Sequence, residues 1–271
     1  MSEALSETEP ETIPAATLIL LRDVPGGAPE LPMVGRGAHL AFAANRMVFP
    51  GGRVDPDDRL LATRADLLVD GPEIEADELA HRIAAIRETI EEIGLAPGIE
   101  PVKDVAAIEE IRAALHGGEP LSAILERLGL RIDVHDIRPF ARWLPKLRLH
   151  RRFDTRFYIT RAPALGEAIA DGVESSHCLW GTARQHLAAG KLIFPTICTL
   201  EWIAQAGDFA QAIERTRHYP VETVTPWIEQ RDGEEWLCIP DGLGYPKTAQ
   251  RLSLLDSDAV TNRPSIARSP G

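Results

Sequence analysis

Residues 83–95 read Ile83-Ala84-Ala85-Ile86-Arg87-Glu88-Thr89-Ile90-Glu91-Glu92-Ile93-Gly94-Leu95. Apolar residues recur through this stretch and just before it, at spacings of four, three, four and three, at Leu79, Ile83, Ile86, Ile90 and Ile93. At about 100° per residue these side chains fall on one narrow stripe, which predicts an amphipathic helix. The glycine that follows predicts the end of the helix, because a left-handed residue commonly stands there.

Three carboxylates, on Glu88, Glu91 and Glu92, lie on the opposite face of this helix. Like charges three or four residues apart destabilise a helix by about 0.2–0.5 kcal/mol per pair. One interpretation is a solvated face, on which the repulsion is small. The other is a cation site, because Mg²⁺ takes oxygen ligands and a carboxylate cluster supplies them. The helix by itself leaves both interpretations open.

The glycines upstream of the helix favour the cation site. Gly51-Gly52, Asp58 and residues 87–95 together resemble the Nudix box: Gly, five residues, Glu, seven residues, then Arg-Glu-apolar-x-Glu-Glu-x-Gly-apolar. The second half matches at every specified position except Thr89, which is polar in an apolar position. Charged and glycine positions at fixed offsets are far more specific than a lone glycine-rich loop. By this resemblance the chain is identified as a member of the Nudix hydrolase superfamily.

Two departures from the pattern concern its first half. Asp58 stands where the family has Glu, and 28 residues (59–86) separate it from Arg87, where the family has seven. The box therefore carries about 21 extra residues, the difference between 28 and seven. The insertion leaves the second half intact, whereas the alignment of Asp58 is loose.

The resemblance implies an α/β/α sandwich with a mixed sheet, with extra helices inserted within the box (about 59–78) and after it (102–130). Residues 14–255 are expected to form a single Nudix domain, between a disordered leader (1–13) and a disordered tail (256–271). Hydrophobic patterns predict strands at 15–22, 32–36, 47–49, 137–144, 153–160 and 176–180, and a hairpin within 221–240. They predict helices at 59–69, from 75–78 to Gly94, and at 102–115, 121–130, 182–189, 197–206 and 209–217.

The resemblance also implies a metal site and its chemistry. Glu88, Glu91 and Glu92, with the Gly51 carbonyl, would hold Mg²⁺ or Mn²⁺. Arg87 would orient these carboxylates, as an i, i+4 partner of Glu91. The general base is expected to be either Glu92 or Glu174, which shortly precedes a strand that contains a Trp.

A basic cluster stands out in this acidic chain: Arg148, Arg151, Arg152 and Arg156. Arginine binds phosphate in bidentate fashion, so these residues are candidates for holding the substrate phosphates. The alternative is a solvated loop whose arginines pair with surface carboxylates.

The substrate is predicted from a narrower resemblance. Residues 40–57 (Leu-x-Phe-Ala-x-Asn-x-x-Val-Phe-Pro-Gly-Gly-Arg-Val-Asp-Pro-Asp) and 152–158 (Arg-Phe-Asp-Thr-x-Phe-Tyr) are similar to a branch with an interrupted box. That branch includes peroxisomal-type coenzyme A diphosphatases and their bacterial relatives, which implies coenzyme A or acyl-CoA as substrate. ADP-ribose, NADH or a nucleotide sugar stays open. Two non-enzyme hypotheses are a Nudix ligand sensor and an interaction protein with a solvated acidic helix.

Composition bounds the remaining classes of function. The 271 residues are 44% hydrophobic and 26% charged, and the net charge of −12 argues against nucleic-acid or anionic-membrane binding. Residues 1–14 lack the basic start and apolar core that would predict a signal peptide, and no apolar run is long enough to predict a membrane span. Cys178, Cys198 and Cys238 are far apart, which fits reduced thiols in a cytoplasmic protein, and the histidines show no metal-ligand spacing. A homodimer stays open.

Overall fold

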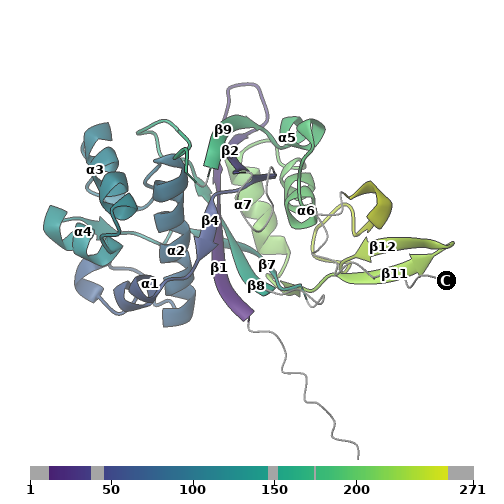
Figure 1. Cartoon of the computed structure of the whole chain (residues 1–271), viewed down its shortest axis with the longest axis horizontal. Coiled ribbons are helices and arrows are strands. Elements are labelled where there is room, and N and C mark those ends of the chain that lie inside the picture. The colour runs from purple at the N-terminus through teal and green to yellow at the C-terminus, as the bar shows by residue number, and fades with distance from the viewer. Residues whose placement is uncertain (1–11, 38–45, 146–151, 174, 256–271) are drawn as a thin grey trace, which may run out of the picture.

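The structure is a computed structural model that describes residues 12–37, 46–145, 152–173 and 175–255. It is an α/β/α sandwich, which confirms the fold class expected from the sequence. The sheet strands stand in the middle, with helices α1 to α4 on one side and α5 to α7 on the other (Figure 1). The helices are α1 (Pro56–Leu61), α2 (Ala76–Ile93), α3 (Val105–His116), α4 (Leu121–Leu128), α5 (Ala183–Ala189), α6 (Phe194–Ile203) and α7 (Phe209–His218).

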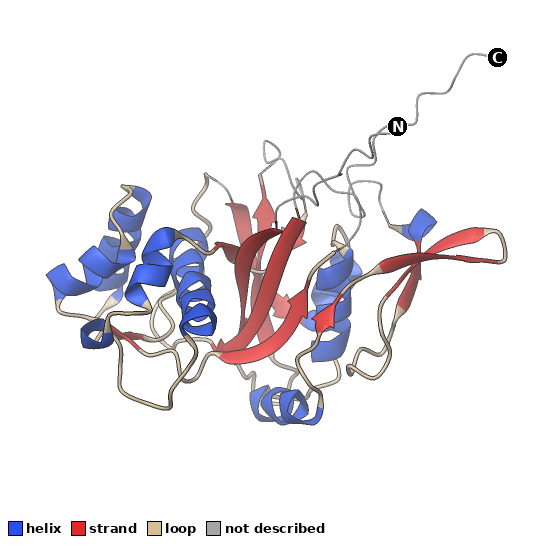
Figure 2. Cartoon of the chain, turned by 90° about the horizontal axis from the view of Figure 1, so that it is seen from below, coloured by secondary structure: helices blue, strands red, loops and turns tan. Residues whose placement is uncertain are grey.

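Two sheets form the middle layer, seen between the two groups of helices in Figure 2. The larger is mixed, in the order β10-β7-β8-β1-β4, and the smaller is antiparallel, in the order β3-β2-β9. The strands of the larger sheet are β1 (Thr12–Leu21), β4 (Gly51–Arg53), β7 (Arg138–Trp143), β8 (Arg152–Arg161) and β10 (Thr223–Val224). Those of the smaller sheet are β2 (Glu30–Arg36), β3 (Met47–Val48) and β9 (Ser175–Thr182).

Strand β1 is buried on both faces, which explains its continuous apolar sequence. Leu18 and Leu20 pack into the core that contains α2, whereas Ile19 and Leu21 pack into the core that contains α6. β1 pairs in parallel with β8 along its whole length and antiparallel with β4 at residues 15–17, in its middle. It begins at Thr12, inside the leader that the sequence predicted to be disordered.

Helix α2 is the predicted amphipathic helix. All five residues of its apolar stripe are at most 8% exposed, and each buried Ile contributes about 1.5–3 kcal/mol to the free energy of unfolding. The helix ends at Gly94, whose φ of 69° is in the left-handed region. The opposite face is therefore free to present polar groups.

The insertion within the box folds differently from the expected helix at 59–69. Helix α1 starts earlier, at Pro56, with Asp55 as its N-cap, and a 3₁₀ turn (Ala65–Leu67) follows it. Proline favours the first turn of a helix, so Pro56 moves the start upstream and places Asp58 inside the helix.

Helices α3 and α4 confirm the predicted helices after the box. Two short paired strands, β5 (Ile99–Glu100) and β6 (Arg131–Ile132), bracket them. Neither strand was predicted, because two residues are too few for a periodic pattern. The pairing closes the helical insertion into one unit, whose apolar residues join the core of α2.

The C-terminal part of the described chain forms a hairpin that extends from the body (Figure 1). It consists of β11 (Trp227–Arg231) and β12 (Glu234–Cys238), to which β13 (Ala249–Arg251) adds a third strand. Within the described residues, no helix combines the length and apolarity needed to cross a membrane.

Candidate active site

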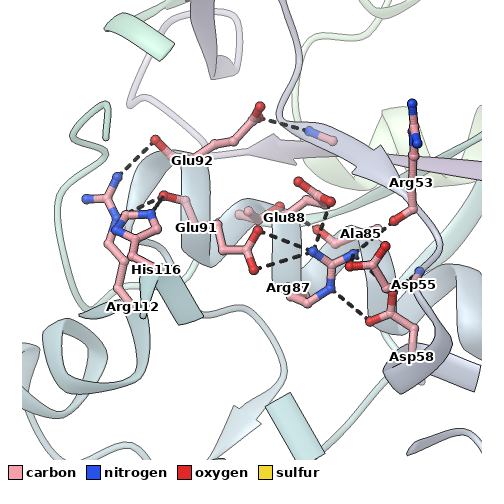
Figure 3. A network of polar contacts seen from close by, with 12 residues as sticks. Arg53, Asp55, Asp58, Ala85, Arg87, Glu88, Glu91, Glu92, Arg112 and His116 are labelled. Atoms are coloured by element: carbon pink, nitrogen blue, oxygen red, sulfur yellow. Dashed lines mark hydrogen bonds and ion pairs between the residues drawn. The ribbon is translucent and has the colours of Figure 1, made fainter. Parts of the chain in front are cut away.

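Arg87 stands at the centre of a polar network that joins three segments (Figure 3). Its Nε and Nη2 donate to the two carboxylate oxygens of Asp58, both at 3.0 Å. Its Nη2 also donates to the Arg53 carbonyl at 2.9 Å, at the end of β4. Arg87 is 6% exposed and Asp58 is fully buried. The pair therefore fixes α2 against α1 and against the glycine-rich strand.

The remaining amino group of Arg87 faces the box carboxylates. Its Nη1 donates to Glu88 at 2.9 Å and to Glu91 at 3.2 and 3.4 Å. Each carboxylate side chain is only partly exposed, at 15% for Glu88 and 25% for Glu91. One guanidinium thus holds both groups in place, as Figure 3 shows.

Glu92 takes a different direction from its neighbours. Its Oε2 accepts a hydrogen bond from the Gly51 backbone amide at 3.0 Å, and the residue is 4% exposed. Gly52, the next residue, lies against the Glu88 carboxylate so closely that a Cβ at this position would overlap it. A glycine pair is therefore required where β4 approaches two carboxylates of α2.

Burial perturbs the titration of this face. Burial raises the pKa of Glu88 to about 7, and the Glu91 charge adds to the shift although Arg87 opposes it. Burial likewise raises the pKa of Glu91, again against Arg87. A solvated acidic face would not show such shifts, so the helix face is a partly desolvated carboxylate cluster.

Thr89, the one departure in the second half of the box, is accommodated locally. The residue is fully buried, and its hydroxyl donates to the Ala85 carbonyl at 2.7 Å. A buried hydroxyl that is bonded one turn back along the helix costs little compared with one left unpaired. The polar residue therefore fits an apolar position of the pattern.

The donor set of this cluster fits a divalent metal ion. Glu88, Glu91 and Glu92 offer hard carboxylate oxygens, and the glycine pair leaves a cradle that a Cβ would fill. Among the described residues, no three His, Cys, Asp or Glu side chains are close enough together to coordinate one metal ion in their present conformations. Two of the carboxylates are instead bonded to Arg87 and the third to Gly51.

The basic cluster is described only in part. Arg148 and Arg151, like the candidate base Glu174, lie outside the described residues. Arg156 pairs with Asp77 and Glu78 at the start of α2, and these ion pairs favour a structural role. Arg152 is buried at the start of β8. Phosphate binding by these arginines stays a prediction.

Two residues at the site were missed from the sequence. Arg112 and His116, one turn apart on α3, donate to backbone carbonyls at the C-terminal end of α2 (Figure 3). Arg112 lies 20 residues after Glu92, and His116 lies 25 residues after Glu91. No sequence motif connects either residue to the box. An available signal was the absence of Lys, Arg and His from the last turn of the box helix.

No protein-family model and no curated protein matches the chain. Among solved structures, a Nudix hydrolase from Alicyclobacillus acidocaldarius is 30% identical, covers 76% of this chain and 97% of its own, and has a TM-score of 0.66. A MutT Nudix hydrolase from Burkholderia pseudomallei is 15% identical, with coverages of 70% and 97% and a TM-score of 0.39. The Nudix domain of Shewanella oneidensis NrtR, solved with ADP-ribose, is 13% identical, with coverages of 79% and 99% and a TM-score of 0.38.

The first of these relatives is matched over almost its entire length at 30% identity. The sequence identity to this relative, the box residues and the α/β/α sandwich all point to the same family. The chain belongs to the Nudix hydrolase family.

Proposed function

We propose that this Nudix hydrolase is a metal-dependent diphosphatase that cleaves the phosphoanhydride of coenzyme A or acyl-CoA. The observation that carries the proposal is the position of the Arg87 guanidinium, which donates to both Glu88 and Glu91 and holds them on one desolvated face of α2. A face built in this way suits a cation that binds a polyphosphate. The products would be a phosphopantetheine compound and 3′,5′-ADP.

The residues of the site have distinct roles in this proposal. Glu88, Glu91 and Glu92, with the Gly51 carbonyl, would hold Mg²⁺ or Mn²⁺. When bound, the metal ion neutralises phosphate charge and polarises the P–O bond. Arg87 keeps two carboxylates oriented, and its bond to Asp58 keeps Arg87 itself in place.

A general base must take a proton from the attacking water. Glu92 is one candidate, because its carboxylate lies beside the Gly51 amide on the same face as the cluster. Glu174 is the other, and it follows a segment that bonds to the end of α2 through Asp171. A pH–rate profile of variants at both positions distinguishes them.

The choice of coenzyme A rests on the sequence branch, and a cavity whose lining contains none of the box carboxylates agrees with it. The cavity has a volume of 590 Å³ and lies against the segment that follows α2. Apolar side chains form most of its lining, among them Ala96, Ile99, Val102, Ile108 and Leu165. An aliphatic chain such as the acyl group of acyl-CoA suits such a lining better than a sugar does.

The alternatives keep the same site but change its use. ADP-ribose, NADH or a nucleotide sugar would need the same metal chemistry on a different phosphoanhydride. A non-catalytic ligand sensor would not need three desolvated carboxylates, so Glu88, Glu91 and Glu92 argue against it. These substrates belong in the same assay.

The test is hydrolysis of a substrate panel by the full chain with Mg²⁺ or Mn²⁺. The panel contains coenzyme A, an acyl-CoA, ADP-ribose, NADH and a nucleotide sugar. Glu91→Gln together with Glu92→Gln is expected to lower kcat by about 100-fold or more. The matched control is Glu109→Gln with Glu110→Gln, an adjacent and exposed pair on α3, which should retain full activity.

Each outcome bears on one part of the proposal. No product from any substrate would contradict the enzymatic function. Activity that survives the double change at 91 and 92 would contradict the site. Cleavage of other substrates without cleavage of coenzyme A or acyl-CoA would contradict the substrate while leaving the diphosphatase in place.

A further inference from the structure

The C-terminal end of α2 receives its positive charge from another helix. α2, which the structure describes throughout, has no Lys, Arg or His in its last turn. The exposed carbonyls of a helix end carry partial negative charge and need donors. Arg112 of α3 supplies them, since its Nε donates to the Glu91 carbonyl and its Nη2 to the Glu92 carbonyl, both at 3.0 Å.

The same guanidinium reaches a third segment. Arg112 Nη2 also donates to the Ile169 carbonyl at 2.8 Å, in the connection between β8 and β9. That connection is bonded directly to α2, because the Ile169 amide donates to Ile93 at 2.9 Å and the Asp171 amide to Glu92 at 3.1 Å. Arg112 therefore lies where the insertion, the box helix and the β8–β9 connection meet.

The geometry points to Arg112 as a positioning residue for the box carboxylates. It bonds the backbone of the two residues, Glu91 and Glu92, whose side chains belong to the cluster. The Ile169 and Asp171 amides also bond this helix end, but among the described residues Arg112 alone ties both the helix end and that connection to α3. Loss of these bonds would weaken the last turn, and a shift of its backbone would move both carboxylates. We propose that the inserted helix α3 holds the catalytic end of α2 in register through Arg112, an inference that rests on the proposed function.

Gly94 is part of the same arrangement. A Cβ on Gly94 would lie 2.9 Å from Arg112 Nη1, so the glycine of the box leaves room for the guanidinium. His116, one turn further along α3, adds a bond from its Nε2 to the Glu91 carbonyl at 3.0 Å. Burial lowers the pKa of Arg112, as expected for a guanidinium held against backbone rather than in water. Arg112, which lies outside the box, thus contacts the box at two places, the carbonyls of Glu91 and Glu92 and the space beside Gly94.

The experiment compares Arg112→Met with the matched control Arg127→Met in the full chain. Arg127 belongs to the same helical segment but pairs, among the described residues, with Glu110 and Glu119, whose side chains are 53% and 35% exposed. For Arg112→Met we expect kcat to fall by about 10- to 100-fold, with KM changed by less than about threefold. We expect the dissociation constant for Mn²⁺, measured without substrate, to rise by about tenfold. Arg127→Met should match the wild type in all three.

Hydrogen exchange supplies a readout of the geometry itself. In Arg112→Met the amides of Ile169 and Asp171 should exchange faster, while amides in the middle of α2 keep their protection. Unchanged kcat and Mn²⁺ affinity, despite faster exchange, would show a merely structural residue and overturn the proposal. The same loss of kcat in Arg127→Met would also overturn it.

Arg112→Lys covers the case in which the methionine variant does not fold. Lysine keeps the charge but lacks the planar fork, so we expect kcat and Mn²⁺ affinity to fall by about threefold or more. Wild-type values for both would overturn the proposal. If the wild type cleaves no substrate of the panel, the proposed function fails, whereas Mn²⁺ affinity and exchange still decide the role of Arg112.

Discussion

Arg87 of the box helix and Asp58 of helix α1 form a bidentate ion pair, with both hydrogen bonds at 3.0 Å. The two residues are 29 positions apart in the chain, and Asp58 is fully buried. Despite the residues inserted between them, Asp58 therefore lies beside Arg87, and the box pattern has an acidic residue at the position of Asp58. The sequence left the alignment of Asp58 with the acidic position of the box loose, and its contact with Arg87 supports that alignment.

Removal of Asp58 should be severe, because it leaves a buried guanidinium without its main partner. We expect Asp58→Ala to lower the free energy of unfolding by about 3–5 kcal/mol, measured by urea denaturation. Asp66→Asn is the control, because Asp66 forms an ion pair with Arg64 on the surface, and its unfolding midpoint should match the wild type. An unfolding midpoint of Asp58→Ala equal to that of the control would contradict a stabilising role for the buried ion pair of Asp58 with Arg87.

The two glycines of the box should respond differently to alanine. At Gly52 the added Cβ overlaps the flexible end of Glu88, so kcat/KM should fall by about 10- to 100-fold with little change in stability. At Gly51 it overlaps the Ala16 carbonyl of β1, and the strand pair must separate, at about 1–3 kcal/mol. Gly27→Ala, which meets only Val24 at 3.5 Å, is the control. Activity assays and thermal unfolding of the three variants check this contrast, which equal effects at 51 and 52 would refute.

Gly94→Ala should cost more stability than the same change at Gly129. Both glycines end a helix in the left-handed region, with φ of 69° and 65°, so both substitutions carry a backbone strain of about 1–2 kcal/mol. Only Gly94 also crowds a neighbour, Arg112, whereas the space beside Gly129 is open. Denaturant unfolding should therefore show a larger loss at 94, and kcat should fall only there. Equal losses of stability at 94 and 129 would mean that the Arg112 side chain moves aside without cost, and they would contradict the prediction.

Two buried histidines predict a loss of stability in acid. Burial lowers the pKa of His81 and of His186 below the ordinary value of 6.5, although the carbonyls of Asp77 and Leu31 oppose it. Below 6.5 the unfolded chain binds protons that the folded chain does not, so the free energy of unfolding falls as the pH falls through this value.

The measurement is urea unfolding as a function of pH in His81→Gln with His186→Gln. This double variant should lose part of the decrease in stability below pH 6.5 that the wild type shows. His218→Gln, at a side chain that is 67% exposed, serves as the control and should follow the wild type. Identical pH dependence in the double variant and the wild type would refute the prediction.

The local pattern of the sequence was sufficient for the helix and its carboxylates. The spacing of Ile83, Ile86 and Ile90 predicts the buried stripe, and all three are fully buried. The apolar run of β1 likewise predicts a strand that is covered on both faces. These features are encoded within one or two turns or a single strand, where neighbours in sequence are neighbours in space.

The contacts of the site were decided by the tertiary structure. That Glu92 bonds Gly51, that Asp58 meets Arg87 and that Arg112 reaches the end of α2 all join segments at least 20 residues apart. Such contacts depend on the path of the whole chain, because the hydrophobic pattern predicts the helix that carries Arg112 but not where it packs, and strands of two residues leave no pattern. The sequence by itself therefore determined the family, the box helix and the donor types. Only the folded chain decided which partners orient them, because burial and packing, not spacing, bring those partners together.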